Sequence, residues 1–318
     1  KMKEHYGIPY MGSKEKILDL IQYIFQREHG KKYFIDLFCG GFCVSAYALK
    51  NTKFKVLSND LNYYVIALYK EILFNNSKEI NKVWFDWVSR EKFKDVKNNP
   101  QNYPDWYVGY VLTIWSFGNN QSDYLFSRDI EELKKNAHQY LIDNGYKENK
   151  NKRIELLKKF KEIEKLSRRF ELERLQQLER LQQLERLERL ERLERLQQLE
   201  QLQQLERLDS MDWFDFIKSI PISILENAFI YCDPPYENTT KYQKNSMDYE
   251  MFWNWFRDCP YPVYASSYSA PKDIKIINFR NKIILLSTQK ERKKSKENIY
   301  FNGRGNYSRT MHDMLFNK

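Results

Sequence analysis

The stretch Ala228-Phe229-Ile230-Tyr231-Cys232-Asp233-Pro234-Pro235-Tyr236 decides the fold class of this chain. Its first five residues are rich in branched and aromatic side chains, a pattern typical of a buried parallel strand. The two prolines then end the strand and stiffen the backbone just beyond its carboxyl end, the edge of an open α/β sheet where ligands bind. We therefore predict a site at Asp233, Pro234 and Tyr236, where a carboxylate, a fixed carbonyl and an aromatic ring can hold an amino group and stack on the base that carries it. An ordinary turn is the alternative.

Two further strands are predicted nearer the N-terminus. Lys32-Tyr33-Phe34-Ile35-Asp36-Leu37-Phe38-Cys39-Gly40-Gly41-Phe42 reads as a strand, a glycine turn and the start of a helix, and Gly40 and Gly41 allow positive φ and close approach to a ligand. The turn lacks the full dinucleotide spacing of glycines and no lysine follows it, which argues against an NAD site and a phosphate loop. Residues 54–58 form the next strand, and Asp60 follows it. A carboxylate at that distance from the glycine turn typically binds ribose hydroxyls, with a helix cap as the alternative.

A third segment, Ile8-Pro9-Tyr10-Met11-Gly12-Ser13-Lys14, stands directly ahead of a predicted amphipathic helix. Together the three segments, in this order and with a long insert before Asp-Pro-Pro-Tyr, resemble the Dam-like, alpha-group family of DNA adenine-N6 methyltransferases. The resemblance covers roughly residues 6–75 and 226–317, and residues 312–317 look like the closing strand of that family. The chain departs from it at Cys39-Gly40-Gly41-Phe42, where many relatives carry Gly-x-Gly, and this weakens the assignment of the glycines.

The resemblance implies an α/β fold, in which a Rossmann-like S-adenosylmethionine-dependent methyltransferase sheet carries an inserted, largely helical target-recognition region. We expect the catalytic domain at residues 1–75 and 210–318 and the insert at residues 76–209. The expected reaction is transfer of the methyl group of S-adenosylmethionine to N6 of an adenine flipped out of double-stranded DNA. An RNA adenine or DNA cytosine-N4 methyltransferase of the same fold is the alternative.

The resemblance also assigns roles to single residues. Asp233 and the Pro234 carbonyl would accept the two N–H bonds of the adenine amino group, and Tyr236 would stack on the base. The residues implied in cofactor binding are Tyr10, Lys14, Asp36, Phe38, Gly40, Asp60 and Asp233. Plain packing remains an alternative for Tyr10, and a surface position for Lys14.

The composition and the charge narrow the class of protein. The net charge is +10, and 42% of the residues are hydrophobic, enough for a sizeable core. The sequence shows no signal peptide and no apolar run of membrane-spanning length, and its four cysteines form no metal or disulfide framework, so we expect a reduced, cytoplasmic protein without a bound metal.

Two polar segments are candidates for contacting DNA. A basic cluster at a predicted hairpin tip would bind phosphates, and amides on a loop near residue 120 can pair with adenine edges. These candidates are Lys290, Arg292, Lys293, Lys294, Asn119, Asn120 and Gln121. A solvated charged loop and a simple turn are the respective alternatives.

A low-complexity repeat fills residues 171–208, where leucine recurs at every third position from Leu172, mostly with Glu-Arg or Gln-Gln between. The composition favours helix, and Glu and Arg four residues apart support it. A period of three makes the leucine stripe circle the helix, which disfavours a long zipper. We expect a long helix that acts as a spacer within the recognition region, with weak self-association through exposed leucines as a further option.

Two interpretations concern the wider setting of the protein. A restriction endonuclease is a candidate partner. A non-catalytic helical scaffold is the competing class suggested by the repeat, and failure to bind S-adenosylmethionine would support it.

Overall fold

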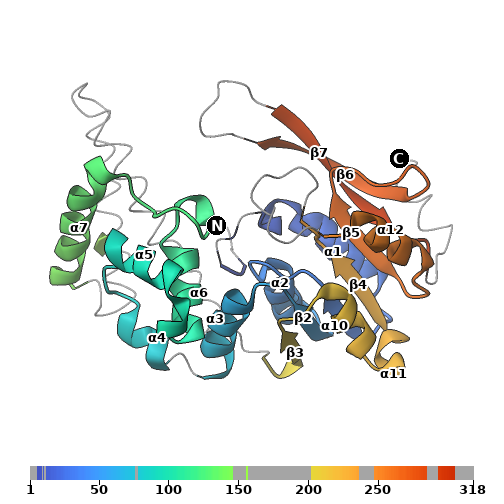
Figure 1. Cartoon of the computed structure of the whole chain (residues 1–318). Coiled ribbons are helices and arrows are strands. Elements are labelled where there is room, and N and C mark those ends of the chain that lie inside the picture. The colour runs from blue at the N-terminus through green and yellow to red at the C-terminus, as the bar shows by residue number, and fades with distance from the viewer. Residues whose placement is uncertain are drawn as a thin grey trace. The chain divides into compact units, whose positions relative to one another are not determined.

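The computed structural model describes residues 6–8, 10, 12–75, 78–145, 155–156, 202–235, 247–284 and 293–304. The chain divides into two compact units (Figure 1). The sheet unit consists of Lys14–Asn62 and Glu200–Lys318, and the helical unit consists of Lys1–Ser13 and Tyr63–Leu199. The boundaries of these units differ from those of the insert expected at residues 76–209. Residues 63–75 belong to the helical unit, and residues 200–209 belong to the sheet unit.

The sheet unit is built around seven strands in the order β3-β2-β1-β4-β5-β7-β6. The strands are β1 (Tyr33–Asp36), β2 (Lys55–Asn59), β3 (Leu205–Asp209), β4 (Ala228–Cys232), β5 (Val263–Ser267), β6 (Lys275–Ile284) and β7 (Lys293–Phe301). The first five strands of that order pair in parallel, and β7 is antiparallel to both of its neighbours. The order reverses between β1 and β4, which makes their carboxyl ends the topological switch point. The predicted Rossmann-like α/β sheet is confirmed.

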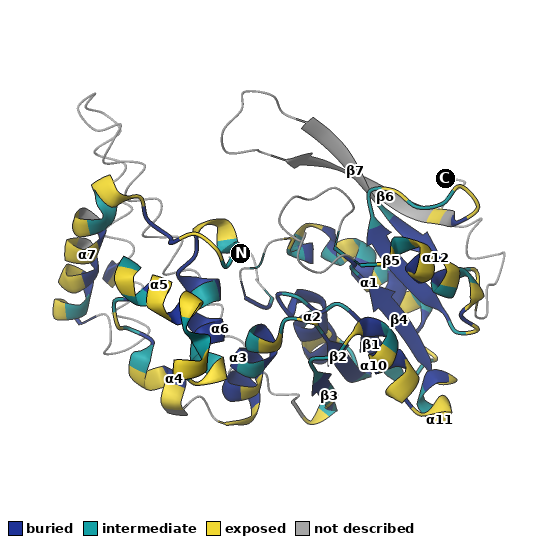
Figure 2. Cartoon of the chain, viewed as in Figure 1, coloured by how far each residue is buried: buried dark blue, intermediate teal, exposed yellow. Residues whose placement is uncertain are grey.

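Helices cover both faces of this sheet. They are η1 (Lys14–Ile17), α1 (Leu18–Arg27), α2 (Cys43–Asn51), η5 (Leu202–Gln204), α10 (Trp213–Ser219), α11 (Ile222–Leu225) and α12 (Tyr249–Asp258). Figure 2 shows that β1, β4 and β5 are almost wholly buried, as expected for parallel strands with both faces covered.

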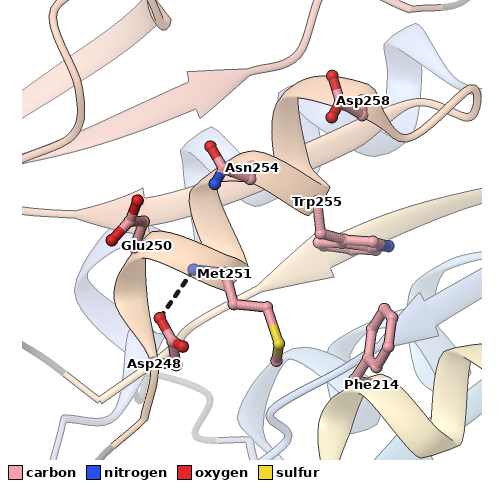
Figure 3. Close-up of a pocket in the computed structure, with 7 residues that line it drawn as sticks. All are labelled: Phe214, Asp248, Glu250, Met251, Asn254, Trp255 and Asp258. Carbon is pink, nitrogen blue, oxygen red and sulfur yellow. Dashed lines mark hydrogen bonds between the residues drawn. The ribbon is translucent and has the colours of Figure 1, made fainter.

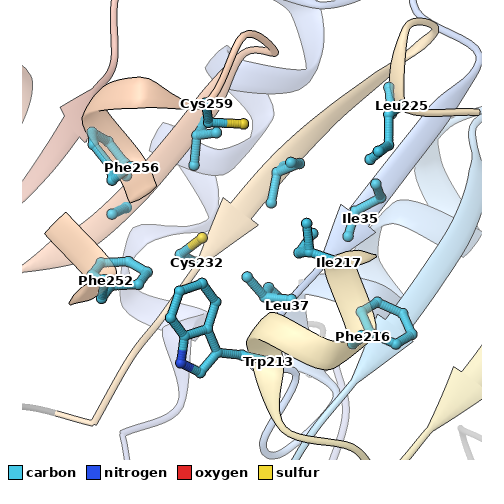
Figure 4. Packing of buried hydrophobic residues seen from close by; sticks show 14 of the residues in the cluster. Ile35, Leu37, Trp213, Phe216, Ile217, Leu225, Cys232, Phe252, Phe256 and Cys259 are labelled. Atoms are coloured by element: carbon cyan, nitrogen blue, oxygen red, sulfur yellow. The ribbon is translucent and has the colours of Figure 1, made fainter. Parts of the chain in front are cut away.

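Successive side chains of each strand point to opposite faces of the sheet. On one face Ile35, Leu37 and Cys232 pack in a buried cluster with residues of α10 and α12, among them Phe216 and Phe252 (Figure 4). On the other face Phe34 and Phe229 contact the ring of Phe25 from α1, with ring centroids 4.9 and 5.8 Å away. Asp36 and Tyr231 are two residues beyond Phe34 and Phe229, so they belong to this second face.

The end of the leucine repeat corrects one prediction. A helix was expected over residues 171–208, but residues 202–204 form a 3₁₀ turn and residues 205–209 form β3, while residues 157–201 lie outside the described residues. Leu205 is paired with Val56 of β2 and Leu208 with Ser58, and a register shift between them absorbs the extra residue. This bulge turns a spacing of three in the repeat into a spacing of two in the sheet, so both leucines are buried. Pairing and burial therefore override the helix propensity of these residues.

The helical unit contains α3 (Tyr63–Phe74), α4 (Lys78–Val83), α5 (Arg90–Asn98), η2 (Pro100–Asn102), α6 (Asp105–Ile114), η3 (Phe117–Asn119) and α7 (Arg128–Asp143). Helices α3 and α6 approach closely at Gly109, where a Cβ atom would lie 2.1 Å from the Tyr64 carbonyl oxygen. Elsewhere in this unit the half-buried ring of Trp87 is stacked on the buried ring of Phe126. No helix in the described part of the chain is long and apolar enough to cross a membrane.

Candidate active site

Four polar side chains of the candidate site come from the carboxyl ends of neighbouring parallel strands. Asp36 is the last residue of β1, Asp60 follows β2, Asp233 follows β4, and Ser266 lies at the end of β5. Parallel strands end at the same edge of a sheet, so strand pairing alone gathers these residues. We call this part of the sheet unit the carboxyl edge.

Asp233 is held at both carboxylate oxygens. The Ser266 hydroxyl donates a hydrogen bond to Oδ1 at 3.0 Å, and Lys14 Nζ forms an ion pair with Oδ2 at 2.7 Å. The Lys14 side chain is only 4% exposed, whereas that of Asp233 is 20% exposed. A buried ammonium is costly unless it is paired, so this ion pair explains how Lys14 can be buried. The alternative of a surface position for Lys14 is wrong.

Asp36 combines burial with an unused acceptor. Its Oδ2 accepts a hydrogen bond of 2.6 Å from the Ser45 hydroxyl, while its Oδ1 is buried and has no hydrogen-bond partner among the described residues. Burial raises the pKa of Asp36 to about 7, and the Ser45 hydrogen bond opposes this effect. The negative charges of Asp233 and Asp60 raise the pKa further. A carboxyl group in this state gains from binding a cation.

The glycine turn after β1 forms a hydrogen bond with Asp60. Gly40 has a φ of 43°, and its backbone N–H donates to Asp60 Oδ2 at 2.8 Å. Asp60 Oδ1 accepts the N–H of Asn62 at 2.9 Å, and burial raises the pKa of the Asp60 carboxyl group. Both bonds fix the orientation of this carboxylate, whichever role it has.

One of the two glycines of this turn does not use its conformational freedom. Gly41, predicted to allow positive φ, does not adopt it, and Phe42 has a φ of 60° at the start of α2 instead. The Phe42 side chain is fully buried, and this tertiary packing holds a residue without glycine's freedom in the left-handed region.

Two predicted cofactor residues remain, Phe38 and Tyr10. Phe38 is half-buried on the α10 and α12 face, 6.4 Å from the Trp213 ring and 6.1 Å from the Phe252 ring. Tyr10 is half-buried within the segment grouped with the helical unit, and its carbonyl accepts the N–H of Ser13. The structure therefore brings Lys14, Asp36, Gly40, Asp60 and Asp233 together within the sheet unit.

Several predicted residues cannot be placed in detail. Pro234 is buried directly after Asp233, and the neighbouring Pro235 carbonyl accepts the Tyr249 hydroxyl at 2.6 Å. The other predicted residues are outside the described residues (Tyr236, Lys290 and Arg292) or belong to β7, whose side chains there are not described (Lys293 and Lys294).

The predicted DNA-contacting amides lie on a loop of the helical unit, at residues 117–123. Asn120 Oδ1 accepts the N–H groups of Ser122 and Asp123, and its Nδ2 donates to Asp123 Oδ2 at 2.6 Å. Gln121 Nε2 donates to Thr113 Oγ1 at 3.3 Å, and Asn119 Oδ1 is buried without a hydrogen-bond partner in the described part of the chain. Asn120 and Gln121 therefore bond within their own loop and the helix before it.

Sequence reasoning missed Ser266 and Tyr249. Nothing in the local sequence marks either of them, because each meets the site only through strand pairing or helix packing. The register of β5 against β4 would have been the signal for Ser266.

A pocket of about 500 Å³ lies elsewhere on the sheet unit (Figure 3). It is lined by Phe214, Asp248, Glu250, Met251, Asn254, Trp255 and Asp258, of which all but Phe214 come from α12 or its N-cap. None of the candidate site residues lines it. In the described residues no group of three or more His, Cys, Asp or Glu side chains is placed to hold a metal ion.

Comparison with protein families identifies a matching family. The family model described as D12 class N6 adenine-specific DNA methyltransferase matches residues 10–258. The matched region contains Lys14, Asp36, Asp60 and Asp233, all of which belong to the described site.

Proposed function

This chain belongs to the D12 class of N6 adenine-specific DNA methyltransferases, and we propose that the carboxyl edge of its sheet binds S-adenosylmethionine and carries the methyl transfer. The family match shows that the chain is an enzyme that methylates adenine N6 in DNA. The residues that do so are our proposal. The single observation that carries it is the gathering of Asp36, Asp60 and Asp233 at the carboxyl edge, beside the switch point of the sheet, with Lys14 bound to Asp233.

The residues present fit a cationic cofactor. Asp36 Oδ1 is a buried acceptor without a hydrogen-bond partner in the described chain, and burial and nearby carboxylates hold its pKa near neutrality. An ammonium group would donate a hydrogen bond to Oδ1 and lower the pKa of Asp36 by its charge, whereas a sulfonium would act through its charge alone. When bound, S-adenosylmethionine supplies an electrophilic methyl group on a positively charged sulfur. We propose that Asp36 and Gly40 contact its methionine portion and Asp60 its ribose.

We propose that Lys14, Phe38 and Tyr10 complete the cofactor site. Lys14 is already fixed beside Asp233. The roles of Phe38 and Tyr10 rest on the resemblance to the family.

Asp233 and Pro234 act on the adenine. The amino lone pair of adenine is delocalised into the ring and is a poor nucleophile. A carboxylate offers about four acceptor sites, so Asp233 can accept an N6–H bond while it keeps its bonds to Ser266 and Lys14. The Pro234 carbonyl accepts the second N–H, which aims the lone pair at the methyl group. The carboxylate also stabilises the positive charge that develops on nitrogen, and this charge is removed when N6 loses one of its two protons.

DNA contacts complete the proposal. The target adenine must leave the duplex, which costs a few kcal/mol of unstacking, and Tyr236 recovers part of this by stacking on the base. The cations Lys290, Arg292, Lys293 and Lys294 bind phosphates. The loop of Asn119, Asn120 and Gln121 contacts the target sequence.

Restriction–modification is the typical setting of this family, and we propose a restriction endonuclease of the same target sequence as the partner. The Leu-rich repeat would add weak self-association.

The test is incubation of the full chain with isotopically labelled S-adenosylmethionine and unmethylated genomic DNA. Nucleoside mass spectrometry should detect labelled N6-methyladenine, and single-molecule mapping should find it at one recurring sequence. Cofactor binding measured by calorimetry with Asp36→Asn and Asp60→Asn should be weakened. Normal cofactor binding in both variants would place the cofactor elsewhere.

A further inference from the structure

Strand pairing places a serine against the proposed catalytic carboxylate. In the register of β4 with β5, Cys232 is paired with Ala265. The next residues on the two strands are Asp233 and Ser266, which therefore lie side by side on the same face of the sheet. This neighbourhood is set by the backbone and not by flexible side chains.

The serine is the middle of a buried hydrogen-bond chain. The Tyr231 hydroxyl donates to Ser266 Oγ at 2.9 Å, and Ser266 donates to Asp233 Oδ1 at 3.0 Å. Ser266 is fully buried and Tyr231 is 1% exposed. Because a serine hydroxyl has one proton, accepting from Tyr231 leaves that proton directed at Asp233.

We propose that Ser266, oriented by Tyr231, is a positioning residue for methyl transfer that fixes the rotation of the Asp233 carboxylate. Lys14 binds Oδ2 and Ser266 binds Oδ1, so both oxygens resist rotation of the carboxylate about its Cβ–Cγ bond. With this rotation fixed, the carboxylate presents its oxygens to the adenine amino group in one defined direction, and this direction aligns the amino group. The inference rests on the proposed role of Asp233.

A positioning role has a specific kinetic consequence. Ser266 touches neither the adenine nor the cofactor in this proposal, so its loss should leave both KM values unchanged. Small errors of alignment lower the rate of the chemical step strongly. A hydrogen bond to a charged group is strong enough that its removal should lower the single-turnover rate about tenfold.

The experiment compares four variants with the wild-type enzyme in single-turnover methylation of duplex DNA. Ser266→Ala should react about tenfold more slowly, and Tyr231→Phe, which frees the serine hydroxyl to rotate, about threefold. Ser266→Thr keeps the hydroxyl and should restore most of the rate. In the double variant, Ser266→Ala with Tyr231→Phe, the rate should match that of Ser266→Ala alone, because both act through one hydrogen bond.

Stability separates positioning from simple packing. Ser266→Ala removes an acceptor of the buried Tyr231 hydroxyl and should lower Tm, whereas the double variant removes both hydroxyls and should recover part of that loss. Recovery of Tm without recovery of rate supports the proposal. Recovery of both together would show that Ser266 acts only through folding and would overturn it.

Matched controls identify which proposal fails. Ser267→Ala changes the adjacent residue, whose hydroxyl accepts, among the described residues, a long 3.4 Å bond from the Ser269 N–H, and it should leave the rate unchanged. Calorimetric binding of S-adenosylmethionine should be the same in Ser266→Ala and wild type. An active Asp233→Ala variant would refute the proposed function itself. An inactive Asp233→Ala with a fully active Ser266→Ala would refute only the inference drawn here.

Discussion

The carboxyl edge of the sheet and the loop at residues 117–123 differ in how they use their polar side chains. At the carboxyl edge, Asp36 keeps a buried acceptor without a hydrogen-bond partner in the described residues, and Asp233 is held by Ser266 and Lys14, which come from other segments of the chain. In the loop, Asn120 uses its side-chain oxygen on two backbone N–H groups of its own turn, and Gln121 bonds back to Thr113.

The difference follows from how the backbone is stabilised. Strand pairing satisfies the backbone groups of β1 and β4, so the carboxylates at their ends are not needed as partners of those backbone groups. An irregular loop has no such ladder, and its amide side chains replace the missing backbone partners. Substitutions should therefore affect chemistry at the carboxyl edge and local order in the loop.

The largest expected effect is at Asp233. Asp233→Ala removes the proposed acceptor of the N6–H bond and the electrostatic stabilisation of the transition state. The rate of methylation should fall at least about a thousandfold while DNA binding survives. Single-turnover rates and an electrophoretic shift assay measure the two quantities. Asp215→Ala, which removes an exposed carboxylate of the same unit, is the matched control and should be fully active.

The second effect is a dependence of cofactor binding on pH. Asp36 has a raised pKa of about 7, so it is ionised above pH 7 and protonated below it. A cationic cofactor binds the ionised form, and its affinity should fall as pH falls, by about fivefold or more between pH 7.5 and pH 6.

Isothermal titration with S-adenosylmethionine in the absence of DNA measures this affinity. In Asp36→Asn the affinity should be weaker and no longer vary across this range. An equal pH dependence in both proteins would assign the titration to another group.

A smaller effect is expected in the loop. Asn120→Ala removes the acceptor of the Ser122 and Asp123 N–H groups, so hydrogen exchange at these two amides should become about fivefold faster, equivalent to about 1 kcal/mol. Gln121→Gly preserves the left-handed backbone at that position, where φ is 57°, and is the control. Unchanged exchange in Asn120→Ala would show that the side chain is free to bind DNA without reordering the loop.

The smallest effect is expected in the repeat. Deletion of residues 178–189, two six-residue units, leaves β3 intact and should change neither the methylation rate nor the target sequence. Single-molecule mapping of methylated DNA tests this. A shifted target sequence would show that the repeat takes part in recognition.

The sequence was most informative where local pattern and chemistry coincide. The apolar run before Asp233 and the run before Asp36 each predicted a buried strand with a carboxylate at its end, and both are present. The sequence was less informative about the loop, because an amide that contacts DNA and an amide that closes a turn have the same local pattern. It was misleading in the repeat, where residues with helix propensity form β3.

The sequence by itself determined the strands at the switch point and the carboxylates at their ends, because buried apolar runs and strand-ending prolines act over a few residues. Only the tertiary structure decided the rest. Pairing with β2 turns Leu205 and Leu208 to one face, and strand register brings Ser266 to Asp233. Tertiary packing also holds Phe42 in the left-handed region. Each depends on register and packing between segments distant in the sequence, which no local pattern encodes.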